Sequence, residues 1–172
     1  MLARTTLMIV FSGNYAHAID AKNRLAIPAK HRSRMDPERD GKCLVVVPGQ
    51  PADRLWLYTE RHFEQLAARA DSTLIPDDDQ LRFDQAYFPL AEYLEIDAQG
   101  RILVPEWMVK RANLGHDVVI CGVRDHLELR RRDTFEKELD LNWQQHRELQ
   151  LKARSAYQDR RRQTGPDEAG SH

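Results

Sequence analysis

Cysteine is scarce in this sequence: Cys43 and Cys121 are the only two among 172 residues. Each lies in an apolar run, CLVVV and VVIC, so buried free thiols are the expected state. Two isolated cysteines strongly favour this state over a disulfide framework or a cysteine-based metal site. The seven histidines are scattered without the H-x-x-x-H spacing of zinc sites, and we predict no bound metal.

Long apolar runs are also missing, and no stretch reaches the length of a membrane span. The N-terminal MLARTTLMIVF has a short apolar patch and no small-residue cleavage site after it. The P-loop, Rossmann and G-x-S-x-G motifs of enzymes are absent. The sequence therefore predicts a cytoplasmic protein that is not an enzyme and takes no cofactor, no small-molecule ligand and no membrane partner.

Charge of either sign is balanced overall, at a formal net charge of −1, but it is unevenly distributed. Residues 1–34 carry six basic residues against one acidic residue, whereas residues 71–97 carry eight acidic residues against one basic residue. Adjacent residues rarely converge on one metal ion. Asp77, Asp78 and Asp79 are therefore expected to form a solvated acidic loop and not the metal site of a hydrolase. A basic face, as DNA-binding proteins need, can exist on this neutral chain.

An internal repeat is the main feature present. IDAKNRLAIP at 19–28 matches IDAQGRILVP at 96–105 at an offset of 77, with five identities in ten positions. Further on, LWLYTERHFEQL at 55–66 resembles LELRRRDTFEKEL at 127–139 at an offset of 72. The change of offset falls in a loop, where insertions are tolerated. The chain is therefore predicted to contain two copies of one small unit.

Each unit has the pattern of a β-rich fold with short helices. An alternating strand leads into a D-x-x-x-R turn, in which Asn23 and Gly100 are residue types that tolerate positive φ. A second strand follows, then Pro28 or Pro105 at the start of a short helix, with Gly115 placed to cap the second such helix. We predict an α+β fold of two tandem units that form a pseudo-twofold, double barrel-like core.

The predicted organisation has six consecutive segments. Apolar residues recur at helical spacing after Asp133, which predicts one long helix to about Gln163. Leu81, Phe83, Tyr87 and Phe88 indicate that the acidic stretch between the units packs onto the body. The segments are an N-terminal extension (1–10), a first repeat domain (11–70), an acidic connector (71–93), a second repeat domain (94–140), a C-terminal helix (141–164) and a disordered tail (165–172).

The doubled motif resembles the MraZ family. FSGNYAHAIDAKNRLAIPAKHR at 11–32 is similar to the family's F-x-G segment and its D-x-K-G-R-[apolar]-x-[apolar]-P-x-K-[aromatic]-R run. IDAQGRILVPEWMVKRANL at 96–114 is similar to the second run of the family, and the likeness covers roughly residues 11–140. This chain departs from the pattern in Asn23 for a glycine, His31 for an aromatic residue and Arg130 for a tryptophan.

The resemblance implies tandem SpoVT-AbrB-type domains, a ring-shaped homo-oligomer and association with the nucleoid. It also implies sequence-specific binding to direct repeats in a promoter that controls division and cell-wall genes, with the protein acting as a repressor. Two alternatives stay open: an AbrB-type antitoxin or transition-state regulator, and an oligomeric scaffold that binds no DNA.

In the family the D-x-x-x-R turns are associated with double-stranded DNA. Arg24 and Arg101 could each bind guanine through two hydrogen bonds or clamp a phosphate, and Lys22 suits phosphate. Asp20 and Asp97 are expected to orient the turns, because phosphate repels a carboxylate. Further basic residues widen the face around the first turn: Lys30, Arg32 and Arg34.

The two turns differ in charge. The first turn has Lys22 and basic neighbours, whereas the second has Gln99 with Glu95 and Glu106 close in sequence. We therefore expect the first turn to make most of the DNA contact and the second to support it. A surface Asp–Arg pair of this kind can also be a simple ion pair of small energetic value, and its recurrence in the same context favours the DNA-binding interpretation.

Overall fold

The computed structural model describes residues 9–69 and 78–163. It divides the chain into two units, Met1–Arg132 and Asp133–His172. The N-terminal extension up to residue 8, the start of the acidic connector through residue 77 and the predicted disordered tail lie outside the described residues.

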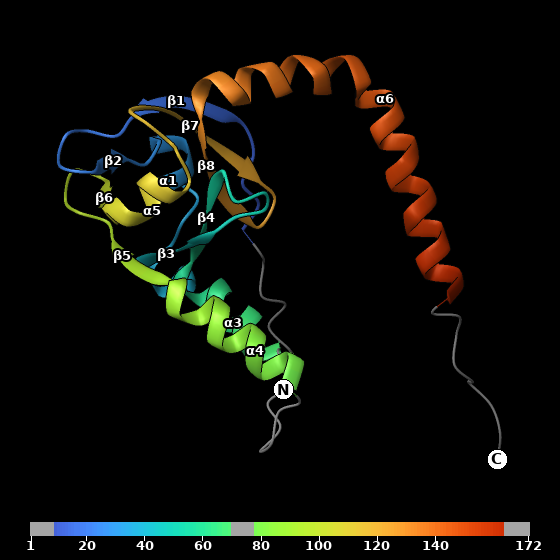
Figure 1. Ribbon diagram of the computed structural model, residues 1–172, viewed down its shortest axis with the longest axis horizontal. Helices are drawn as coiled ribbons and strands as arrows, with labels where there is room; N and C mark the ends of the chain where they lie inside the picture. The colour runs from blue at the N-terminus through green and yellow to red at the C-terminus, as the bar shows by residue number, and fades with distance from the viewer. Residues whose placement is uncertain (1–8, 70–77, 164–172) are drawn as a thin grey trace. The chain divides into compact units, whose positions relative to one another are not determined.

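The first unit is built on two antiparallel sheets (Figure 1). One has six strands in the order β1-β7-β8-β4-β3-β5, and the other is a ribbon of β2 and β6. The strands are β1 (Asn14–Ala18), β2 (Arg24–Ala26), β3 (Cys43–Pro48), β4 (Arg54–Thr59), β5 (Glu92–Glu95), β6 (Arg101–Leu103), β7 (Asp117–Val123) and β8 (His126–Arg131). The helices are α1 (Ala29–Arg32), α2 (Pro37–Asp40), α3 (Glu60–Arg69), α4 (Asp78–Tyr87), the 3-10 turn η1 (Phe88–Leu90) and α5 (Glu106–Arg111). The predicted α+β class is confirmed.

The two repeats exchange strands within the six-stranded sheet. Strand β1 belongs to the first repeat but pairs with β7 of the second, and β5 of the second repeat pairs with β3 of the first. Counted inward from either edge, the sheet therefore has the first strand of one repeat followed by the third and fourth strands of the other. Strands β4 and β8 meet in the middle. This order confirms the predicted pseudo-twofold arrangement and shows that the repeats share one sheet.

The strand register marks the pseudo-twofold axis at two places. In the β2–β6 ribbon Leu25 pairs with Ile102, which is the residue 77 positions later. In the large sheet Trp56 pairs with Glu128, which is the residue 72 positions later. Both pairs join residues that the repeat matches to each other, as a twofold axis requires. The offset of 77 therefore relates the repeats in the ribbon, and the offset of 72 relates them in the large sheet of the same symmetric structure.

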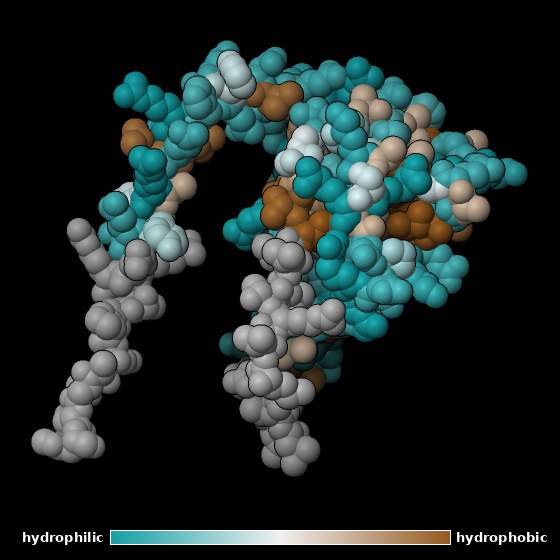
Figure 2. Space-filling model, turned by 180° about the vertical axis from the view of Figure 1, so that it is seen from behind, coloured by the Kyte–Doolittle hydropathy of each residue, from teal (hydrophilic) through white to brown (hydrophobic). Residues whose placement is uncertain are grey.

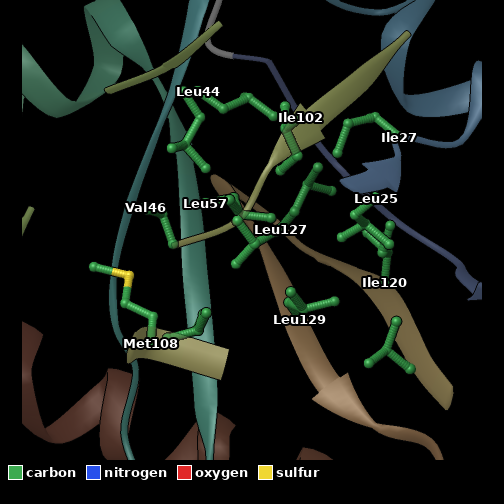
Figure 3. Close-up of a cluster of buried hydrophobic side chains, with 14 of the residues drawn as sticks. Leu25, Ile27, Leu44, Val46, Leu57, Ile102, Met108, Ile120, Leu127 and Leu129 are labelled. Atoms are coloured by element: carbon green, nitrogen blue, oxygen red, sulfur yellow. The ribbon is translucent and has the colours of Figure 1, made fainter. Parts of the chain in front are cut away.

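The main core lies between the ribbon and the large sheet and draws on both repeats. Figure 3 shows Leu25, Leu57, Ile102, Leu127 and Leu129 converging from β2, β4, β6 and β8. A second cluster of Val45, Val47, Tyr58 and Phe63 buries other side chains of β3 and β4 with α3. Because β3 is covered on both faces, its sequence is continuously apolar instead of alternating.

The short helix of the second repeat ends differently from the prediction. Gly115 was expected to cap it, but α5 ends at Arg111 and the positive φ that follows belongs to Asn113, at 49°. The amide of Leu114 donates to the carbonyl of Val109, and the amide of Asn113 donates to that of Lys110. These two bonds form a Schellman cap, in which asparagine replaces the usual glycine. Gly115 has a positive φ two residues further on.

The described part of the acidic connector forms α4 and η1, which the sequence analysis did not predict. Tyr87 and Phe88 pack against the second cluster, as expected, whereas Leu81 and Phe83 are exposed. The ring of Phe83 stacks on that of Tyr87 at a centroid distance of 5.1 Å. The connector is thus anchored to the sheet through two of its four large apolar residues.

The second unit holds one long helix, α6 (Arg132–Gln163), which confirms the predicted long C-terminal helix. Its surface is hydrophilic with apolar residues interspersed, visible in brown in Figure 2. The large exposed apolar residues along it are Leu139, Leu141, Trp143, Leu149, Leu151 and Tyr157. Within the residues that the structure describes, no helix is long and apolar enough to cross a membrane.

A buried charged network lies at the axis in the large sheet. Glu128 is 8% exposed, accepts a hydrogen bond from Nε1 of Trp56 at 2.9 Å, and lies 3.6 Å from Nη1 of Arg54. Nε2 of His126 is 3.7 Å from the same carboxylate, and its Nδ1 is 2.8 Å from Asp125. Burial opposes the charge on both groups. The contacts with Glu128 and Asp125 nonetheless raise the pKa of His126. The contacts with His126, Arg54 and Trp56 lower the pKa of Glu128.

This network predicts a pH dependence of stability that His126 controls. A raised pKa in the folded state means that His126 contributes stability in full below its ordinary value of 6.5, and that this contribution is lost as pH rises through the folded-state pKa. Urea unfolding between pH 6 and 9 should therefore show a decline in the free energy of unfolding that His126→Gln lacks. An identical pH profile for both proteins would contradict the charged state of His126.

Candidate nucleic-acid interface

The first D-x-x-x-R turn is held by one carboxylate. Oδ1 of Asp20 accepts the backbone amides of Lys22 and Arg24, both at 2.9 Å. Its Oδ2 accepts Nε of Arg24 at 2.7 Å. The predicted orienting role of Asp20 in the turn is therefore seen in the geometry, since a single side chain fixes both the backbone of the turn and the direction of the guanidinium.

The second turn repeats this arrangement atom for atom. Oδ1 of Asp97 accepts the backbone amides of Gln99 and Arg101, at 2.8 and 2.9 Å. Its Oδ2 accepts Nε of Arg101 at 2.9 Å and lies 2.8 Å from Nη2. Asn23 and Gly100 take the positive φ of the two turns, at 59° and 76°, as the sequence predicted. The departure of Asn23 from the family's glycine therefore leaves the turn intact.

The hydrogen bonds at the aspartates also fix their charge. The backbone amide of Arg24 is the largest cause that lowers the pKa of Asp20 to about 2. The equivalent amide of Arg101 lowers the pKa of Asp97. Both carboxylates are therefore ionised at neutral pH, and each holds its arginine in one orientation.

The two arginines project from one exposed face of the ribbon. Arg24 pairs with Leu103 and Arg101 pairs with Ala26, so the two arginines are diagonal neighbours across the β2–β6 pair. Diagonal neighbours in antiparallel strands lie about 7–8 Å apart. The alternate residues, Leu25 and Ile102, point into the core. The side chains of Arg24 and Arg101 are 38% and 28% exposed, which leaves both accessible to a ligand.

The turns also hold each other. The carbonyl of Asn23 accepts the amide of Val104, and the carbonyl of Gly100 accepts the amide of Ile27, each at 2.9 Å. Each turn of one repeat is thus bonded to the strand end of the other. The two arginines therefore belong to one rigid arrangement across the ribbon.

Arg32 adds a positive charge at the second turn. Its Nε donates to the carbonyl of Ile27 at 3.0 Å. Its guanidinium lies against Gly100, where a Cβ would come within 2.4 Å of the Arg32 Cζ. The second turn, which has Gln99 where the first has Lys22, thus gains a cation from the first repeat. Sequence reasoning grouped Arg32 with the first turn because the contact to Gly100 spans 68 positions.

The structure brings together six of the eight residues that the sequence analysis assigned to the DNA-binding face. The exceptions are Lys30, whose Nζ lies over the ring of Tyr15 on β1, 5.8 Å from the ring centre, and Arg34, which lines a pocket beside it. The six at the ribbon and its turns are Asp20, Lys22, Arg24, Arg32, Asp97 and Arg101.

Substitution of Gly100 tests the packing at the second turn. Gly100→Ala should lower the free energy of unfolding by roughly 1–3 kcal/mol, because a Cβ at φ 76° is strained and meets the Arg32 guanidinium. The matched control is Asn23→Gly in the first turn, for which we expect a change of a few tenths of a kcal/mol. Urea unfolding measures both, and equal losses would contradict the strain of a side chain at the positive φ of Gly100.

Potential metal ligands do not gather at this face. Across residues 9–69 and 78–163, no group of three or more His, Cys, Asp or Glu side chains is arranged to hold a metal ion. Cys43 and Cys121 are free thiols, and Cys121 is buried. Burial raises the pKa of Cys121 to about 11, which keeps this thiol protonated.

The interleaved repeats and their paired Asp–Arg turns define a tandem AbrB-like protein. Comparison with known families assigns it further: the family described as "MraZ protein, putative antitoxin-like" matches residues 10–84 and 88–157. The chain belongs to the MraZ family.

Three relatives show the extent of this likeness. The transcriptional regulator MraZ of Clostridium tetani is 30% identical over 133 residues, which cover 77% of this chain and 89% of the relative. The protein of the same name from Neisseria meningitidis serogroup A is 35% identical over 131 residues, covering 76% and 85%. That of Mycoplasmoides gallisepticum is 34% identical over 140 residues, covering 81% and 94%. The chain thus belongs to a family whose named members are transcription regulators, which is not a class of enzyme.

Proposed function

We propose that this protein is a transcription regulator that binds promoter DNA through the β2–β6 ribbon. The observation that carries the proposal is the pair of accessible arginines, Arg24 and Arg101, held by carboxylates on one face of a symmetric ribbon. A guanidinium fixed before binding loses less conformational freedom when it meets DNA. The names of the relatives support regulation of transcription as the use of this surface.

The geometry of the ribbon suits the major groove, which admits a two-stranded β-ribbon. The backbone positions of the two arginines are diagonal neighbours, which lie about 7–8 Å apart, or about two base-pair steps of about 3.4 Å each. In this arrangement Arg24 and Arg101 bind guanine edges, while Lys22 and Arg32 bind the flanking phosphates. Because both turns carry two cations, we propose that both contact DNA.

The resemblance extends the proposal to the target and the assembly. We propose repression of a division and cell-wall gene cluster, binding to direct repeats in its promoter, a ring of identical subunits and association with the nucleoid. A ring would present several ribbons to consecutive repeats, and such multivalency strengthens binding without further contacts. This would compensate for the small net charge of the chain, which is −1.

A binding assay with the DNA upstream of the protein's own coding region tests the proposal. We expect tighter binding to this fragment than to a shuffled one, with log affinity falling against log salt by about 0.9 for each phosphate contacted. A scaffold without DNA-binding activity would show neither effect. A toxin gene next to the coding region, in place of division genes, would favour an antitoxin.

A further inference from the structure

A second basic site lies between β1 and α1, outside the two Asp–Arg turns. It is a pocket of about 320 Å³ lined by Ser12, Tyr15, Lys30, His31, Ser33 and Arg34. None of these residues is acidic, and three of them carry hydroxyl groups. The pocket thus combines two cations with several hydrogen-bond donors and no carboxylate.

Within the part of the chain that the structure describes, the positive charge in this pocket has little compensation. Nη1 of Arg34 makes one long bond, at 3.4 Å, to the carbonyl of Val10. The pKa of His31 is lowered first by burial and then by the positive charges of Arg34 and His17. The local potential therefore favours an anion.

His31 is a buried polar residue with spare hydrogen-bonding capacity. It is 1% exposed, and its ring lies edge-on to those of Phe11 and Tyr15. Its Nε2 has no hydrogen-bond partner among the described residues. Buried polar side-chain atoms almost always have a partner, and functional sites are among the exceptions.

Comparison of the repeats shows that packing alone does not require these residues. The residue 77 positions after His31 is Met108, which is equally buried and fills the same place with an apolar side chain. The residues that match Tyr15 and Lys30 are Glu92 and Trp107, and these bind each other through Nε1 of Trp107 at 2.9 Å. At the same offset Arg34 is matched by Arg111 and Ser33 by Lys110, which pairs with Glu106, so the repeats differ at the other three places. There the second repeat has Met108 and the bonded Trp107–Glu92 pair, whereas the first repeat has Lys30, Tyr15 and a histidine with an unpartnered Nε2.

We propose that the pocket between β1 and α1 of the first repeat binds a phosphate group. Lys30 and Arg34 supply charge-assisted hydrogen bonds, which are the strong kind for phosphate. The hydroxyl of Ser12 and Nε2 of His31 complete the ligand set, whereas the Ser33 hydroxyl donates to the carbonyl of Lys30 at 3.2 Å. The phosphate belongs either to a small phosphorylated molecule or to the DNA backbone. Binding of a small molecule goes beyond the proposed function, whereas binding of the DNA backbone rests on that function.

Titration with inorganic pyrophosphate and phosphate at constant ionic strength tests the first source. Calorimetry should show saturable binding that falls by at least about tenfold in Lys30→Gln/Arg34→Gln, because each lost cation removes a charge-assisted bond. The control Arg69→Gln/Arg82→Gln removes the same charge from exposed positions and should bind like wild type. In the wild-type protein the imidazole nitrogen resonances of His31 should shift during the titration, which needs no variant.

The same variants, assayed with promoter DNA at one salt concentration, test the second source. A loss of DNA affinity in the pocket variant that exceeds the loss in the control assigns the pocket to a backbone phosphate. Pyrophosphate binding without this loss assigns it to a small molecule and stands even if the protein binds no DNA. The proposal is overturned if neither anion shifts the His31 resonances and the two double variants behave alike with DNA.

Discussion

Replacing Arg24 and Arg101 together by alanine will lower the affinity for promoter DNA by roughly a hundredfold or more, because a bidentate arginine–guanine pair contributes about 1–3 kcal/mol. The fold should persist, since both side chains are accessible and, among the described residues, each forms an ion pair only with the aspartate of its own turn. Exposed ion pairs of this kind add little to stability. Gel shift or fluorescence anisotropy at fixed salt measures the loss.

Two controls separate geometry from charge in this experiment. Arg69→Ala/Arg82→Ala removes two positive charges from exposed positions and should bind within about threefold of wild type. Arg24→Lys/Arg101→Lys keeps the charge but loses the planar fork, so it should retain non-specific binding and lose preference for the promoter. Wild-type affinity in the double alanine variant would refute the ribbon as the DNA-binding surface.

The single variants compare the two turns. The sequence analysis predicted that the first turn dominates, because it has Lys22 where the second has Gln99. The contact of Arg32 with Gly100 restores a cation to the second turn, and the ribbon places both arginines on one face. We therefore expect Arg24→Ala and Arg101→Ala to have similar effects. Near wild-type binding by Arg101→Ala alone would instead support the earlier prediction that the first turn makes most of the DNA contact.

Local features of this fold could be predicted because their signals are local. The positive φ at Asn23 and Gly100 and the carboxylates that bind the turns follow from residue types within five positions of one another. The repeat itself predicted the pseudo-twofold, which the pairs Leu25–Ile102 and Trp56–Glu128 confirm.

The exchange of strands between the repeats could not be predicted in this way. Strands β1 and β5 occupy equivalent positions in the two repeats, so the local pattern is the same whichever repeat receives each strand. The contact of Arg32 with Gly100 was missed for a related reason, since it forms only when the two turns are brought together. The cap at Asn113 was missed because glycine is the commoner cap and Gly115 lies two residues further on.

The axis of the large sheet shows how divergence between the repeats has been accommodated. Trp56 in the first repeat is matched by Glu128 in the second, and the two residues bond to each other across the axis. Arg130, which departs from the family's tryptophan, is buried and lies opposite Arg54 in the register. An aromatic and ionic network thus occupies a place where an exact repeat would have brought two identical side chains together.

Glu128→Gln should therefore lower the free energy of unfolding by about 3–5 kcal/mol, because it removes the negative charge from among buried cations while keeping an acceptor for Trp56. The matched control is Glu92→Gln, whose carboxylate also accepts a tryptophan Nε1 but is less buried, and it should cost about 1 kcal/mol or less. Urea unfolding at pH 7 measures both. Because His126 loses its anionic partner at Glu128, the variant should also lose part of the decline in stability above neutral pH. Equal costs for the two substitutions would mean that the hydrogen bond to tryptophan, and not the buried charge, stabilises the axis.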